Sequence, residues 1–112
     1  MTSTTADTPL SISVERTAGQ VVISLDGDLD VLSADDLQKI GEAALTTPTD
    51  RLVISCTDLA FLDSTGLRCV LLLRVTCHEV GATMTLADPP PFVRTMLDIT
   101  GLTDILLADE AP

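Results

Sequence analysis

The feature that most constrains the fold is a short apolar run followed by a long apolar-rich segment and a further strand pattern. Leu52–Cys56 (LVISC) is continuously apolar, which is typical of a central strand covered on both faces. The segment that follows Phe61–Leu67 stays rich in apolar residues up to Val80, and Gly81 is well placed just after a helix. Thr83–Ala87 then alternates apolar and polar residues, as a strand does. This order predicts a βαβ unit with a right-handed crossover.

Two strands and a helix are predicted before that unit. Ser11–Arg16 and Gln20–Asp26 have strand patterns, and Thr17–Gly19 between them fits a hairpin turn. After Asp30 the apolar period changes to that of a helix, with an apolar face formed by Leu37, Ile40, Gly41 and Ala44. Ser33 followed by Asp36 resembles a capping box at the start of this helix.

The end of the chain predicts one more helix and one more strand. Phe92–Thr100 has a helical apolar face and is followed by Gly101, and Ile105–Leu107 is interpreted as a last strand. The predicted order is therefore β-β-α-β-α-β-α-β, a single α/β domain with a small mixed sheet and helices packed on it. We expect this domain to span residues 10–108, with short tails at 1–9 and 109–112.

Composition excludes several classes of function. The chain has 17 acidic and 6 basic residues, a formal net charge of −11, which argues against binding to nucleic acid or to an anionic membrane. It has no apolar stretch of about 18 residues and no secretory signal. Its three cysteines, an odd number in apolar surroundings, predict buried thiols and a cytosolic location.

The segment Asp63-Ser64-Thr65-Gly66 lies where a predicted strand gives way to a helix. Backbone N–H groups are unpaired at such a junction, and the helix dipole makes it positive. From spacing alone two interpretations stay open. Either Asp63 or Ser64 caps the helix, or the Ser64 hydroxyl is presented for modification, and a phosphate there would add about −1.5 to −2 charge to an acidic surface.

Three other kinds of site are disfavoured. A serine hydrolase would need His78, the only histidine, which is 14 residues from Ser64 on the same predicted helix. A receiver domain generally needs a lysine near the site, and Lys39 lies within the first helix. Asp26, Asp28 and Asp30 do not continue as an EF-hand loop, although weak calcium binding by these three carboxylates stays open.

Three stretches of the chain resemble STAS-domain anti-sigma factor antagonists, also called anti-anti-sigma factors. Gly27–Val31 (GDLDV) is similar to the family's Gly-Glu-Leu-Asp, and Phe61–Leu67 (FLDSTGL) is close to its Asp-Ser-Ser/Thr-Gly-Leu signature. Val93–Leu102 ends in Thr-Gly-Leu, like the family's late-helix motif. The resemblance covers residues of about 10–108.

The resemblance implies a phosphorylation-controlled binding protein rather than an enzyme. Its partners would be an anti-sigma factor of the histidine-kinase-like ATPase type, which phosphorylates a serine of the signature, and a phosphoserine phosphatase. The acceptor would be Ser64, with Thr65 as the second candidate. No cofactor or metal is expected, and no P-loop is present. Monomer and dimer both stay open. The expected partner-binding residues are Asp28, Asp30, Asp63, Ser64, Thr65, Gly66, Leu67, Arg68 and Leu71.

Arg68 departs from the family pattern, in which a small residue often follows Gly-Leu. It is interpreted as a solvated side chain, as a partner of Asp63, or as a group that stabilises phosphorylated Ser64. The main alternative to the switch is a STAS interaction module that is not phosphorylated and serves as a scaffold in a larger signalling or transport complex.

Overall fold

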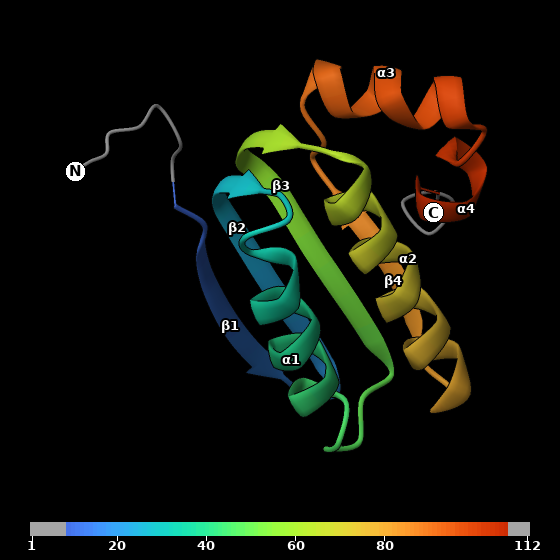
Figure 1. Ribbon diagram of the computed structural model, residues 1–112. Helices are drawn as coiled ribbons and strands as arrows, with labels where there is room; N and C mark the ends of the chain where they lie inside the picture. The colour runs from blue at the N-terminus through green and yellow to red at the C-terminus, as the bar shows by residue number, and fades with distance from the viewer. Residues whose placement is uncertain (1–8, 108–112) are drawn as a thin grey trace.

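The protein, described here from a computed structural model over residues 9–107, is built on one mixed sheet (Figure 1). Its strands are β1 (Ser11–Thr17), β2 (Gln20–Leu29), β3 (Arg51–Leu62) and β4 (Thr83–Ala87), in that spatial order. β1 pairs antiparallel with β2, whereas β2, β3 and β4 are parallel. The predicted tails lie, apart from Pro9, outside the described residues.

Four helices complete the fold: α1 (Ala34–Ala44), α2 (Ser64–Glu79), α3 (Pro91–Thr100) and α4 (Thr103–Leu107). α1 and α2 run side by side over one face of the sheet, and α3 and α4 lie beyond α2, toward the β4 edge (Figure 1). The α/β class and the small mixed sheet are as predicted. The core between sheet and helices is aliphatic, and its fully buried members include Ile23, Leu37, Leu52, Ile54 and Leu73.

Local turn chemistry places the first hairpin turn and the ends of α2 and α3 where they were predicted, whereas β2 and β3 continue to Leu29 and Leu62, beyond their predicted ends at Asp26 and Cys56. Ala18 and Gly19 form a two-residue hairpin turn with φ of 48° and 88°, the left-handed values that a tight hairpin needs. Gly81 follows α2 with a φ of 80°, and Gly101 follows α3 with a φ of 75°; both are left-handed values typical of helix ends. The amide of Leu102 donates to the carbonyl of Leu97 at 2.8 Å, which closes the predicted helix end.

The prediction that Leu52–Cys56 is covered on both faces is wrong. β3 is covered by α1 and α2 on one face only, and it runs to Leu62 with buried and half-buried residues alternating from Leu52 to Cys56. Val53 and Ser55 point to the second face and stay partly exposed. The apolar run Leu52–Cys56 therefore forms a strand with one buried face and one partly exposed face.

The segment predicted as a last strand, Ile105–Leu107, is part of the short helix α4. The amide of Leu106 donates to the carbonyl of Leu102 at 3.0 Å, which is helical pairing. Leu106 is fully buried, and its carbonyl accepts the Thr85 hydroxyl at 3.1 Å. An apolar run this short is compatible with the period of a strand or of a helix. Here the packing of Leu106 against β4 favours the helix.

Candidate functional site

Parallel pairing of β2 and β3 brings their carboxyl ends to the same edge of the sheet. Asp28 lies opposite Phe61 and Leu29 opposite Leu62 in the ladder. The Asp63 amide then donates to the Leu29 carbonyl at 3.4 Å. The turn that follows β2 and the helix that follows β3 are therefore neighbours. This brings together the two motifs singled out in the sequence, Gly27–Val31 and Phe61–Leu67.

Asp63, and not Ser64, caps helix α2. Its carboxylate accepts the Gly66 amide at 2.8 Å, and its own backbone is extended, as an N-cap residue requires. Ser64 and Thr65 are the first two residues of the helix, and both are exposed. Within residues 9–107 neither hydroxyl makes a hydrogen bond, so both face solvent.

Gly66 holds this helix start against the end of β2. A Cβ built at Gly66 would lie 2.5 Å from the Leu29 carbonyl oxygen and 2.8 Å from Leu29 Cγ. Only glycine fits at this approach, because the nearest obstacle is backbone and cannot move aside. Gly66, one of the expected binding residues, is buried, so its observed role is close packing of the helix start on β2.

The turn between β2 and α1 is held by Asp30 and Ser33. The Asp30 carboxylate accepts the Leu32 amide at 3.0 Å. The Ser33 hydroxyl accepts the Asp30 amide at 3.0 Å and donates to the Asp28 carbonyl at 2.8 Å. The predicted capping box is wrong, because Ser33 makes no side-chain bond to the helix and ties the turn to β2 instead.

This turn presents two apolar side chains to solvent beside the helix start. Val31 is 67% exposed and Leu32 is 78% exposed. A groove of about 260 Å³ begins at Val31 and runs between α1 and α2. Its walls are Val31, Ala34, Asp35 and Gln38 on one side and Thr65, Arg68, Cys69 and Leu72 on the other.

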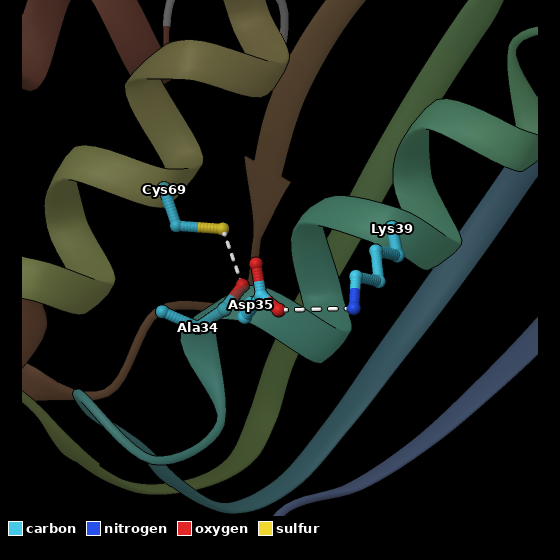
Figure 2. A network of polar contacts seen from close by, with 4 residues as sticks. All are labelled: Ala34, Asp35, Lys39 and Cys69. Carbon is cyan, nitrogen blue, oxygen red and sulfur yellow. Dashed lines mark hydrogen bonds and ion pairs between the residues drawn. The ribbon is translucent and has the colours of Figure 1, made fainter.

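Buried Cys69 is one of the residues that line the groove, and Figure 2 shows its side chain on α2 directed toward Ala34 on α1. Its thiol donates to the Ala34 carbonyl at 3.2 Å, and next to it Asp35 pairs with Lys39 at 3.1 Å. Burial, with a smaller contribution from the carboxylates of Asp35 and Glu42, raises the pKa of Cys69 to about 11. The thiol is therefore protonated at neutral pH and joins the two helices rather than acting as a nucleophile.

The structure divides the expected binding residues into surface and core. Asp28, Asp30, Asp63 and Leu71 are partly exposed, and Arg68 is exposed. Leu67 is only 8% exposed and belongs to the core, so the expectation that it contributes to the docking face is wrong. It follows Gly66 on the face that packs against the sheet.

Three exposed apolar residues were not predicted from the sequence: Val31 and Leu72, which line the groove, and Leu32, which follows Val31 in the same turn. Leu72 is 44% exposed. It comes four residues after Arg68, which itself comes three residues after Thr65, and this spacing places all three on one helix face. That spacing was visible in the sequence. It was hidden because Leu71, Leu72 and Leu73 are consecutive, and only the packing shows which leucine points outward.

Other chemistries find little support at this site. Residues 9–107 contain no group of three His, Cys, Asp or Glu side chains that could hold a metal ion, Asp26, Asp28 and Asp30 included. Ser64 begins α2 and His78 lies in its last turn, about 21 Å along the axis, too far for a hydrolytic pair. Over the same residues, no helix is long and apolar enough to cross a membrane.

Comparison with known proteins agrees with the class that this fold and motif set define. The family model described as "Mlab, STAS domain" matches residues 12–108, and the chain belongs to the STAS-domain family. It is 31% identical to the anti-sigma F factor antagonist of Paenibacillus polymyxa over 98 residues, which are 87% of this chain and 84% of that protein.

Solved structures show the same fold. The anti-sigma factor antagonist SpoIIAA in its unphosphorylated form superposes with a TM-score of 0.77 at 24% identity, covering 87% of this chain and 86% of that one. The Bacillus cell fate determinant SpoIIAA in the phosphorylated form gives a TM-score of 0.71 at 24% identity, covering 87% and 89%. The predicted family resemblance is confirmed.

Proposed function

We propose that this chain is an anti-sigma factor antagonist whose binding ends when Ser64 is phosphorylated. The observation that carries the proposal is the Ser64 hydroxyl, which is exposed at the first turn of α2 and relieved of capping by Asp63. It lies at the sheet edge beside the Asp30 turn. The relative from Paenibacillus polymyxa, named an anti-sigma F factor antagonist, supports the same role.

The groove between α1 and α2 is the docking surface that we assign to the anti-sigma factor. Val31, Leu32 and Leu72 supply apolar contact area at its mouth and wall. Exposed apolar residues gathered in this way mark interaction sites more often than isolated ones do. Because the groove includes Thr65, the residue next to the acceptor, a partner seated here would cover or touch Ser64.

Phosphorylation requires that the partner supply most of the machinery. The Ser64 oxygen would attack the γ-phosphorus of ATP held with Mg²⁺ by a histidine-kinase-like anti-sigma factor, and ADP would leave. The hydroxyl proton would pass to a carboxylate, for which Asp30 and Asp63, in the two neighbouring turns, are the candidates in this chain. This chain is then substrate and switch rather than catalyst, and a phosphatase restores binding by hydrolysing the phosphate.

The added charge explains why binding would end. A phosphate brings about −1.5 to −2 charge to a surface that already contains Asp28, Asp30 and Asp63. Removing this charge from water in an interface costs several kcal/mol, and each ~1.4 kcal/mol is a tenfold change in affinity.

Charge variants at Ser64 test the proposal. Chains carrying Ser64→Ala or Ser64→Glu are used to capture partners from the source cell, and the affinity of the purified anti-sigma factor for each is measured by titration calorimetry. Ser64→Ala binds but is not phosphorylated by the partner with ATP and Mg²⁺, whereas Ser64→Glu binds at least tenfold more weakly.

Thr47→Glu is the matched control, because it adds the same charge at an exposed loop position at the opposite end of β3. It leaves the affinity unchanged. Equal affinities of the wild type, Ser64→Ala and Ser64→Glu chains would contradict the switch and favour a STAS module that acts as an unregulated scaffold.

The groove has a separate test. Leu72→Ser removes an apolar contact from the wall of the groove and weakens binding about tenfold or more, as central interface residues do. Val80→Ser makes a comparable change at a residue of similar exposure, 50%, just after the other end of α2, and leaves binding unchanged. Equal effects of the two substitutions would place the docking surface elsewhere.

A further inference from the structure

Arg68 is an unpaired cation in an acidic neighbourhood. The chain has 6 basic residues against 17 acidic ones, and Arg68 alone among the basic residues lies in the first two turns of α2. Its side chain is exposed, and within residues 9–107 its guanidinium makes no hydrogen bond or ion pair. A cation among carboxylates that pairs with none of them requires an explanation.

Within residues 9–107, the contacts of the carboxylates around the helix start and the groove do not include Arg68. The Asp63 carboxylate accepts the Gly66 amide, and Asp35, across the groove, pairs with Lys39. Asp30 accepts the Leu32 amide in its own turn. The interpretation that Arg68 pairs with Asp63 is therefore not supported.

The helix places Arg68 directly over Ser64. Residues four apart on a helix have Cβ atoms about 5–6 Å apart and face the same side, which is the spacing of favourable ion pairs. A guanidinium at that distance reaches phosphate oxygens and binds them with two parallel N–H donors. The phosphate would also meet the unpaired N–H groups of the first helical turn.

We propose that Arg68 is the intramolecular counter-ion of phosphorylated Ser64, and that pairing withdraws its guanidinium from the groove between α1 and α2. This rests on the proposed phosphorylation of Ser64. Phosphorylation then changes the docking surface twice: it adds negative charge beside the groove, and it removes a cation that lines the groove wall with Thr65 and Leu72.

The test measures the phosphate directly, in chains with phosphoserine incorporated at position 64 during translation, so that no kinase is needed. The second pKa of the phosphoserine, about 6 in ordinary peptides, is followed by ³¹P NMR. Two effects on this pKa are the same in all variants. Nearby carboxylates raise it, those of Asp63, Asp30, Asp28 and Asp35, and the positive helix start lowers it. Because Arg68 favours the dianion, Arg68→Gln raises the pKa by about half a unit or more.

Two control variants and one further NMR measurement define the result. Arg74→Gln removes the same charge from the same helix about 15 Å beyond Ser64 and leaves the phosphoserine pKa unchanged. Arg68→Lys keeps the charge without the planar fork and gives an intermediate pKa. In the wild type, the Arg68 Nε–Hε resonance shifts when the phosphate loses its last proton.

A phosphoserine pKa that is the same in the wild type and Arg68→Gln chains, or that moves equally with Arg74→Gln, would overturn the pairing. That result would leave the proposed function untouched. The proposed function fails by a different observation, namely a phosphoserine-64 chain that binds the anti-sigma factor as tightly as the unmodified chain does.

Discussion

The four residues Asp63–Gly66 form one turn but play three different structural roles. Asp63 caps the helix, Gly66 allows close packing on Leu29, and Ser64 and Thr65 are left exposed. The sequence left two interpretations open here, a helix cap at Asp63 or Ser64 and a Ser64 hydroxyl presented for modification. It did not indicate which residue did which, because Asp and Ser are equally good N-caps and only the hydrogen bond to Gly66 distinguishes them.

Gly66→Ala is predicted to lower the free energy of unfolding by about 2 kcal/mol, because its Cβ would collide with a backbone oxygen. Gly41→Ala is the comparison. Its Cβ would also be crowded, at 2.5 Å from Leu73, but the obstacle is a side-chain methyl, and alanine is favoured over glycine within a helix by about 1 kcal/mol. Urea unfolding measures both, and a cost for Gly66→Ala no larger than that for Gly41→Ala would contradict the close contact.

Between elements, Arg16 ties the first strand to the end of the first helix. Its guanidinium donates to the carbonyls of Ala44 and Pro48 and to the hydroxyl of Thr49, reaching all three from β1. These carbonyls lie at or just beyond the C-terminal end of α1, where backbone acceptors lack helical partners and a cation is favoured. α1 has no basic residue in its own last turn, so Arg16 supplies the cation from another element.

Arg16→Ala is predicted to lower the free energy of unfolding by about 1 kcal/mol, and Arg16→Lys to recover only part of it, because an ammonium group cannot reach three separated acceptors. Arg94→Ala, at an exposed position on α3, leaves the stability unchanged. Chemical unfolding of the three variants decides the point. If Arg16→Ala matched Arg94→Ala, these bonds would contribute nothing measurable.

α4 gives a test of the element that the sequence analysis misassigned. In the helix Leu106 is fully buried and Ile105 is 43% exposed, whereas a strand would place Ile105 and Leu107 together on one face. Leu106→Ala therefore costs about 3 kcal/mol of stability and Ile105→Ala about 1 kcal/mol or less, measured by urea unfolding. A larger cost for Ile105→Ala than for Leu106→Ala would favour the strand.

For the whole molecule, three buried thiols make stability sensitive to alkaline pH. Burial raises the pKa of Cys56 to about 12 and those of Cys69 and Cys77 to about 11. Between the ordinary thiol pKa near 9 and these values, the unfolded chain releases protons that the folded chain keeps. Stability therefore falls as the pH rises through this range.

The free energy of unfolding is predicted to be lower at pH 10 than at pH 8 by on the order of 3 kcal/mol. The chain has no tyrosine and a single lysine, so few other groups titrate here. Urea unfolding at the two pH values gives the difference. In a Cys56→Ala, Cys69→Ala, Cys77→Ala chain the difference largely disappears, and its persistence there would assign the loss to other groups.

The sequence by itself determined the features that depend on neighbouring residues. The hairpin at Ala18–Gly19, the helix ends at Gly81 and Gly101, and the junction at Asp63–Gly66 follow from local backbone preferences. Two of the three family motifs, Phe61–Leu67 and Val93–Leu102, include such positions, so the class of protein was also readable from the sequence.

Only the tertiary structure decided what depends on which elements become neighbours. It buried Leu67 and exposed Leu72, left one face of β3 partly open, and made Ile105–Leu107 a helix. An apolar residue contributes the same hydrophobicity wherever it stands, so whether it enters the core or forms a docking surface depends on the elements that pack over it. The groove beside Ser64 exists because α1 and α2 meet there, and no local pattern encodes that meeting.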